Sequence, residues 1–245
     1  MKYIEKDVLS AEATAYKVEL CKGQLDEESL KDPMIHQGAN GSDIYQLVSS
    51  MQPFFNNLKA RMYAEQGGIC CYCGQKLEYP NHPYQAQYIV EHVYPKEKDR
   101  TIAGEYKNLL LSCRPTDEEE ADRQKVSKSQ RKKFFHCDKS KESEVLTYTP
   151  LQPDCGQHFE YDEFGGIKGT DTDAQKDIEI LNLNCEWLKK RREAAISGEL
   201  YDGNNNLLSD EELRQRQNTV MERDSNNLHS EFCFAIEGAI KHLLT

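Results

Sequence analysis

Long hydrophobic runs are absent from this sequence. The longest uninterrupted run of leucine, isoleucine and valine residues is Leu109–Leu111, whereas a helix needs about 20 consecutive apolar residues to cross a bilayer. Residues 1–20 mix charged and apolar side chains throughout, so they contain no apolar segment of the kind found in signal peptides. We therefore expect a cytoplasmic protein that does not associate with membranes.

Positive charge is also scarce. The 245-residue chain has 31 Lys+Arg residues against 42 Asp+Glu residues, and its formal net charge is -11 at pH 7. Nonspecific binding of nucleic acids depends on cationic surface, so this charge argues against an independent nonspecific DNA-binding protein. Any contact with nucleic acid is expected to be local or shared with a partner. The length allows one large domain or a small catalytic module with helical additions.

Cysteine, by contrast, is plentiful. In a reducing compartment thiols stay unpaired, and the number of cysteines, nine, is odd. Metal ligands together with buried thiols are therefore expected rather than disulfides. The nine residues are Cys21, Cys70, Cys71, Cys73, Cys113, Cys137, Cys155, Cys185 and Cys233.

Periodicity predicts the elements of the first half of the chain. Apolar residues between positions 42 and 66 recur at spacings of three and four, which indicates a helix. We expect Ser42 as its N-cap, a kink or restart at Pro53, and an end at Gly67-Gly68. Residues 87–94 and 106–112 are predicted strands. The charged segment 114–135 is predicted to be a mobile loop or an exposed helix.

The second half is predicted to be mainly helical. Residues 147–169 contain Pro, Gly and aromatic residues that favour irregular structure or a hairpin. Helices are expected over 184–197 with Gly198 as a stop, over 210–222, and over 226–244. Ser209 and Glu212 have the spacing of a capping box for the second of these helices.

A pair of cysteines, Cys70 and Cys73, has the C-x-x-C spacing that lets two thiolates converge on one ion. Because a structural zinc site needs four ligands, Cys113 and Cys137 are the best candidates for a second pair. Twenty-three residues separate them, where a zinc knuckle normally has two.

Other assignments of the cysteines remain open. Cys71 could replace Cys70, and His136 could replace Cys137, although the C-x-x-C geometry favours the first assignment. Buried reduced thiols without a metal are a further alternative.

Three short patterns lie among these cysteines. Glu91-His92 is followed by Pro95, Asn108 precedes the aliphatic run that ends at Cys113, and Cys-Asp-x-x-Lys occupies 137–141. Consecutive side chains of a strand point to opposite faces, so Glu91 and His92 can serve one site only if the strand bends or ends there. Pro95 favours an end.

These residue types suit phosphodiester cleavage. His92 has the ordinary pKa of a general base that works near neutrality. Glu91 and Asp138 offer carboxylate oxygens to Mg²⁺ or Mn²⁺, which can stabilise the charge on the departing sugar oxygen. The alternative for Asp138 is a helix N-terminal residue that is favoured only by the helix dipole.

In this order the patterns resemble the HNH, or ββα-metal, nuclease family over roughly residues 67–141. The resemblance implies an α+β fold, with a β-hairpin that carries Glu91, His92 and Asn108, packed on a helix that begins near Asp138. It also implies that Asn108 orients the histidine or braces the loop. Many relatives carry Asp at the position of Glu91, and Asn or His at the position of Asp138.

A basic stretch precedes the last pattern. Residues 123–141 contain eight Lys and Arg residues against the single acid Asp138. The alternatives are a solvated, charge-paired loop and a loop that contacts phosphates, and its ends lie beside the predicted active site. We predict substrate contacts by Lys139, Lys141, Arg131 and Lys132.

The flanks extend the resemblance to PtuB-type HNH proteins, through Pro150-Leu151-x-Pro153-Asp154-Cys155, Gly165-Gly166-Ile167 and Ile180-Leu181-Asn182-Leu183-Asn184. Such proteins accompany an ATPase in Septu antiphage systems and in some retron systems. The resemblance implies a bacterial defence effector with a PtuA-type ATPase as partner, and an association with a retron reverse transcriptase and its RNA–DNA product.

The organisation expected from these observations is an N-terminal helical region (1–66), a nuclease core with a zinc knuckle (67–145) and a mainly helical C-terminal region (146–245). Two other classes of function remain open. One is a zinc module that binds nucleic acid or protein without cutting, and the other is a structural adaptor.

Overall fold

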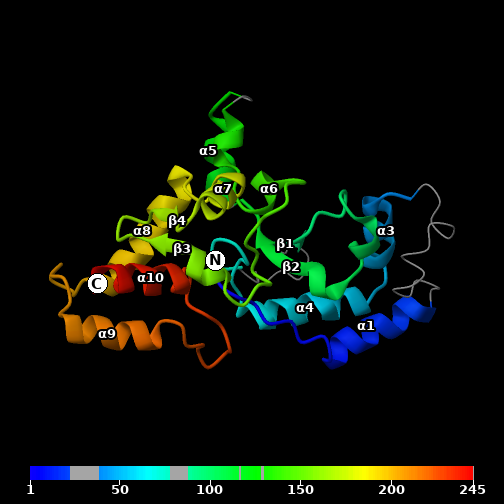
Figure 1. The fold of residues 1–245 in the computed structure, drawn as a ribbon, viewed down its shortest axis with the longest axis horizontal. Helices are drawn as coiled ribbons and strands as arrows, with labels where there is room; N and C mark the ends of the chain where they lie inside the picture. Colours follow the sequence, from blue (N-terminus) through cyan, green and yellow to red (C-terminus); the bar gives the residue numbers. More distant parts are fainter. Residues whose placement is uncertain (23–38, 78–87, 116, 128–129, 245) are drawn as a thin grey trace.

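The computed structural model describes residues 1–22, 39–77, 88–115, 117–127 and 130–244, with only the backbone described at residues 20–22, 117–119, 131 and 132. Helices dominate this part of the chain, and its strands form two separate two-stranded antiparallel sheets (Figure 1). The fold is of the α+β class, as expected.

The N-terminal region contains three helices, α1 (Ala11–Lys22), α3 (Gly41–Ser49) and α4 (Phe54–Gln66). The predicted restart at Pro53 is confirmed, because Pro53 is the N-cap of α4. Gly67 ends α4 with a left-handed φ of 62°. The predicted N-cap Ser42 is wrong, since Asn40 caps α3 and its side chain accepts hydrogen bonds from the backbone N–H of Ser42 and Asp43 at 2.8 and 3.0 Å. An Asn in this geometry satisfies two amides that would otherwise lack partners.

The first sheet is a hairpin of β1 (Tyr88–His92) and β2 (Leu109–Cys113), in which His92 is opposite Leu109. Both strands are shorter than predicted, and residues 106–108 form a 3-10 turn instead of the start of β2. The α4 helix packs against β2. The Gln66 side chain accepts from the backbone N–H of Leu111 at 2.7 Å and donates to its carbonyl at 2.8 Å.

The segment after β2 contains a helix that extends away from the rest of the molecule, α5 (Asp117–Gln124) (Figure 1). Of the two predictions for residues 114–135, a helix is correct for this part, and the α5 side chains that are described are half-buried or exposed. A 3-10 turn (Arg131–Phe134) follows, and then α6 (Asp138–Lys141), a helix of 4 residues. The helix expected near Asp138 begins there and is a single turn.

The C-terminal region lies on the opposite side of the molecule from α1 and α3 (Figure 1). Its hairpin of β3 (Phe159–Tyr161) and β4 (Ile167–Gly169) confirms one alternative for residues 147–169. Four helices follow: α7 (Thr172–Ile180), α8 (Glu186–Leu200), α9 (Asp210–Thr219) and α10 (Cys233–Leu243). The predicted capping box of Ser209 and Glu212 is present at the start of α9.

Three predicted helix limits differ from the structure. Helix α9 ends at Thr219, three residues before the predicted end at residue 222. Helix α8 continues through Gly198 to Leu200, whose side chain is fully buried in a small core with α9 and α10; this burial outweighs the cost of a helical glycine, about 1 kcal/mol. Helix α10 begins at Cys233 rather than near residue 226. At residues 224–228 the chain forms a turn, in which the Asp224 carboxylate accepts hydrogen bonds from the backbone N–H of Asn226 and Leu228, both at 2.9 Å. Such side-chain bonds to the backbone compete with helix formation.

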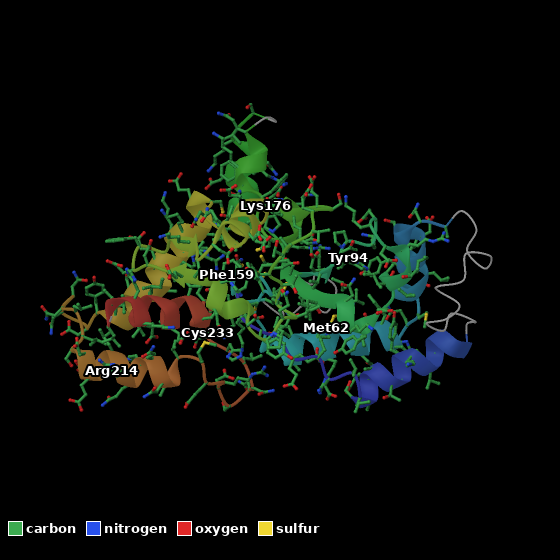
Figure 2. The ribbon with its side chains drawn as sticks, in the orientation of Figure 1. Met62, Tyr94, Phe159, Lys176, Arg214 and Cys233 are labelled. Atoms are coloured by element: carbon green, nitrogen blue, oxygen red, sulfur yellow. The ribbon has the colours of Figure 1, made fainter. Side chains whose placement is uncertain are left out.

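The main hydrophobic core includes residues from all three predicted regions, among them Leu58, Met62, Leu110, Tyr161 and Phe234. Figure 2 labels Met62 on α4 and Cys233 at the start of α10. The predicted boundaries after residues 66 and 145 stay a prediction. No helix within the described residues is both long enough and apolar enough to span a membrane.

Candidate functional site

Four buried thiols meet beside the first hairpin. Cys70 and Cys73 follow the end of α4, Cys113 ends β2, and Cys137 immediately precedes α6. The sulfur atoms all lie within 4.8 Å of one another, with Cys70–Cys137 and Cys73–Cys113 distances of 3.8 Å. The tertiary structure thus brings together two pairs that are far apart in the chain.

The geometry of this four-cysteine group fits a metal such as zinc. Four thiolates at about 2.3 Å from a tetrahedral Zn²⁺ ion are separated from each other by roughly 3.8 Å. Backbone amides also face the sulfurs: the N–H of Cys113 donates to Cys70 Sγ, and that of Gln75 donates to Cys73 Sγ, both at 3.4 Å. Among the described residues the group consists of the four predicted cysteines, and it includes neither Cys71 nor His136.

Backbone conformations that few residues adopt shape this group. Gly74 has a φ of 81°, and a Cβ atom there would lie 2.7 Å from the Phe234 ring, so glycine is required to close the knuckle. Cys137 has a φ of 54°, which is costly for a residue with a side chain. Its N–H donates to the Leu181 carbonyl at 2.9 Å, and this bond helps to hold the conformation.

Asn108 braces the chain that leaves β1. Its Oδ1 accepts from the backbone N–H of Tyr94 at 2.8 Å, and its Nδ2 donates to the Tyr94 carbonyl at 3.0 Å. The Val93 N–H donates to the carbonyl of Asn108 at 3.0 Å. Of the two roles that the resemblance implied, the geometry therefore favours the bracing of the loop. Tyr94 itself is labelled in Figure 2.

His92 is held from two sides. Its Nε2 lies 3.0 Å from the Ala103 carbonyl oxygen, and its ring packs edge-on against Tyr45 of α3, with 4.7 Å between centroids. A carbonyl oxygen only accepts, so Nε2 carries the proton and Nδ1 is left as an acceptor. Burial lowers the pKa of His92 to about 4. The ring is therefore neutral near pH 7, and it is a weaker base than a histidine with the ordinary pKa that the sequence led us to expect.

Glu91, the residue before this histidine in β1, is buried. Its side chain is 2% exposed, and its Oε1 accepts a hydrogen bond from the Tyr72 hydroxyl at 2.6 Å. Burial and the neighbouring Asp138 carboxyl together raise the pKa of Glu91 to about 8, although the Lys141 ammonium acts in the opposite direction. Two carboxyl groups are thus crowded together, an arrangement that a divalent cation would relieve.

The predicted substrate contact by Lys141 is not what the structure shows. The Lys141 side chain is 1% exposed, and its ammonium lies 2.8 Å from Glu91 Oε1 and 3.1 Å from the carbonyl oxygen of His92. A buried ammonium that is already bonded to a carboxylate does not reach a phosphate at the surface. Lys141 is part of the support of Glu91.

Glu91, His92 and Asp138 line one cleft of about 460 Å³. The strand β1 ends at His92, three residues before Pro95, as the sequence predicted. Asp138 is half-buried at the start of α6. Its backbone N–H donates to the hydroxyl of Ser112, at 3.4 Å, which ties α6 to β2.

Two lysines line the same cleft, Lys96 and the exposed Lys139. Lys139 was predicted to contact the substrate, and its ammonium lies 5.4 Å from the centroid of the Phe135 ring. Arg131 and Lys132, which were predicted to act with it, have side chains outside the described residues.

Three residues near the site were missed by sequence reasoning. Lys96 directly follows Pro95 of the motif, and Tyr72 lies between Cys70 and Cys73. The motifs therefore marked both segments, but they did not indicate that these two side chains face the site. Tyr45 had no such signal, since it belongs to an ordinary amphipathic helix.

Comparison with known proteins adds one distant likeness. No protein-family model matches the chain. A protein of Vibrio cholerae serotype O1 biovar El Tor with the name "Retron Vc95 putative HNH endonuclease" is 24% identical over 154 residues. The match covers 59% of this chain and 65% of that protein's length, slightly less than two thirds of it. The likeness suggests a nuclease of the HNH type, in agreement with the motif.

Proposed function

We propose that this protein is a metal-dependent HNH endonuclease that hydrolyses phosphodiester bonds in nucleic acid, with a site of the ββα-metal type. One observation carries the proposal: Glu91 and His92 from β1 and Asp138 from α6 line a single cleft beside a four-cysteine group. A general base and a pair of carboxylates are the parts that this reaction requires.

His92 acts as the general base. With Nε2–H donated to Ala103, Nδ1 is the nitrogen that accepts a proton from the attacking water. The packing of Tyr45 against the ring and the bracing of residues 93 and 94 by Asn108 keep the imidazole in place. Because the histidine is neutral at physiological pH, it needs no prior deprotonation.

Glu91 and Asp138 would hold Mg²⁺ or Mn²⁺. When bound, such an ion stabilises the negative charge that develops on the departing sugar oxygen. The carboxylates supply the hard oxygen donors that these ions prefer. Lys139 and Lys96 at the edge of the cleft contact the phosphates of the substrate, while zinc in the four-cysteine group has a structural role.

The experiment that tests this function is cleavage of plasmid DNA, single-stranded DNA and RNA in Mg²⁺ or Mn²⁺ by the wild type and by His92→Ala. The loss of a general base lowers the rate by about 100-fold or more, and the fold and zinc content are expected to stay unchanged. His242→Ala, an exposed histidine on α10, is the matched control. Undiminished cleavage by His92→Ala would overturn the proposal.

We further propose that the nuclease is an effector of bacterial antiphage defence and acts with a PtuA-type ATPase. The likeness to a protein named for a retron and the resemblance to PtuB-type proteins support this role, as does the charge. A chain with a net charge of -11 repels a polyanionic substrate, and a partner could provide cationic surface. A retron reverse transcriptase and its RNA–DNA product are further proposed partners.

Co-expression tests the proposed partner. Tagged nuclease is expected to capture untagged ATPase, and cleavage at physiological salt is expected to be faster in the complex than with the nuclease alone. A nuclease that cuts efficiently by itself and captures no ATPase would contradict this part of the proposal without affecting the assignment of the active site.

A further inference from the structure

Tyr72 and Lys141 converge on a single oxygen of Glu91. The Tyr72 hydroxyl donates to Glu91 Oε1 at 2.6 Å, and the Lys141 ammonium lies 2.8 Å from the same atom. Tyr72 is 0% exposed and Lys141 is 1% exposed. Both contacts are therefore shielded from water. In such an environment, hydrogen bonds to a charged group are strong.

The single turn of α6 has one face toward Glu91 and another toward solvent. Asp138 and Lys141 are three residues apart and so lie on the same face of the helix, which is the face toward Glu91. Lys139, one residue after Asp138, is exposed and lines the cleft. The two lysines of this turn thus have different surroundings, although the sequence presents them as equivalent.

The Lys141 contact favours the charged form of Glu91, which burial and Asp138 oppose. A carboxylate buried without a partner is very costly, and Glu91 also has Asp138 as a neighbour of like charge. The ammonium of Lys141 compensates one of these charges, and it also donates to the His92 carbonyl at 3.1 Å. One side chain therefore holds the acid and the backbone of the base together.

We propose that Tyr72 and Lys141 are positioning residues that hold Glu91 by its Oε1 atom and direct the other oxygen toward Asp138 and the divalent cation. This inference rests on the proposed nuclease function. It assigns Lys141 to the support of the metal site and leaves Lys139 as the lysine of α6 that meets the phosphate.

Tyr72 also connects the two metal sites. It lies between Cys71 and Cys73, so the same loop that supplies zinc ligands places the hydroxyl on Glu91. The backbone N–H of Cys71 donates to the Leu111 carbonyl at 3.1 Å and anchors this loop on β2. Ordering of the four-cysteine group is thereby linked to the position of the active-site acid.

Thermal unfolding of the zinc-loaded protein without added Mg²⁺ or Mn²⁺ tests the contact itself. Lys141→Met leaves Glu91 buried without its partner and is expected to lower Tm by about 10 °C. The double variant Glu91→Gln with Lys141→Met removes both charges and is expected to recover most of that loss. A double variant that is no more stable than Lys141→Met would show that the two side chains do not act together, and would overturn the proposal.

Cleavage and binding test what the contact does. Tyr72→Phe removes only a hydroxyl and preserves the packing, so it serves if Lys141→Met does not fold. It is expected to raise the Mn²⁺ concentration for half-maximal cleavage several-fold, whereas a purely structural defect would lower the maximal rate alone. An unchanged Mn²⁺ requirement in Tyr72→Phe would contradict the positioning role.

Lys139→Met is the matched control for nucleic-acid binding, measured in the His92→Ala background. It is expected to weaken binding and to reduce the salt dependence by about one phosphate contact, while Lys141→Met or Tyr72→Phe leaves both unchanged. Weakened binding by Lys141→Met equal to that of Lys139→Met would overturn the inference. Absence of cleavage by the wild type, both alone and with the proposed ATPase, would reject the proposed function, but the unfolding measurements would still decide the contact.

Discussion

The side-chain amide of Asn108 is joined to the backbone of Tyr94 by two hydrogen bonds, one in each direction, at 2.8 and 3.0 Å. Asn184 makes the same pair of bonds with the backbone of Ile167 in the second hairpin, at 3.0 and 2.7 Å. Only the first of these bridges lies beside His92. Asn184 is therefore a matched control, within the same protein, for the function of Asn108.

Asn108→Ala is expected to lower the free energy of unfolding by about 2 kcal/mol, because the Tyr94 amide loses its partner. Cleavage is expected to fall by about 100-fold, since a small displacement of a catalytic group is costly. Asn184→Ala should lose comparable stability, measured by denaturant unfolding, with cleavage almost unchanged. Equal effects of both variants on cleavage would refute a special role for Asn108.

Asp138→Ala is expected to raise the concentration of Mg²⁺ or Mn²⁺ needed for half-maximal cleavage by at least about tenfold, and added metal should restore part of the activity. Asp210→Ala removes an acid from the same first position of a helix, α9, and should cost only about 0.5 kcal/mol of stability. If Asp138→Ala loses only a little stability and keeps its metal requirement, as Asp210→Ala should, then Asp138 stabilises the start of α6 and is not a metal ligand.

Zinc analysis tests the four-cysteine group. About one zinc per chain is expected, with Cys73→Ser or Cys113→Ser losing zinc, solubility and about 10 °C or more in Tm, because structural zinc binding is coupled to folding. Cys71→Ser, a buried thiol outside the group, should retain zinc. A well-folded, active preparation without zinc would remove the assignment.

The pH dependence of stability should reflect a second buried histidine. His229 is bonded to Lys2 Nζ at 2.7 Å, and burial lowers the pKa of His229 to about 4. In the unfolded chain this pKa is about 6.5, so the unfolded state binds more protons between pH 6.5 and 4. The contribution of His229 is then fully present above pH 6.5 and is lost as the pH falls towards 4.

The measurement is the free energy of unfolding of the wild type and of His229→Gln at several values of pH from 7 to 4. The difference between the two proteins should change across this window, with the wild type losing more stability on acidification. A difference that is constant with pH would show that His229 titrates alike in the folded and unfolded states.

Local signals predicted much of the fold and part of the site. The capping box of Ser209 and Glu212 and the end of α4 at Gly67 were predicted correctly, because each depends on neighbours within a few residues. Three predictions were wrong because a stronger interaction was present. The Asn40 side chain caps α3 in place of Ser42, and the burial of Leu200 carries α8 past Gly198. The hydrogen bonds of the Asp224 carboxylate replace the helix that was expected from residue 226.

The sequence by itself determined which chemistry the chain can carry: four cysteines in two pairs, the Glu91-His92 pair, Asn108 and Asp138, since each residue type has its own donor atoms and acidity. Only the tertiary structure decided how they are used. It placed Cys73 beside Cys113, brought Glu91, His92 and Asp138 to one cleft, and turned Lys141 inward to Glu91 while Lys139 stayed exposed. The physical reason is that burial and the pairing of charges depend on side chains that are distant in sequence, and no local pattern specifies them.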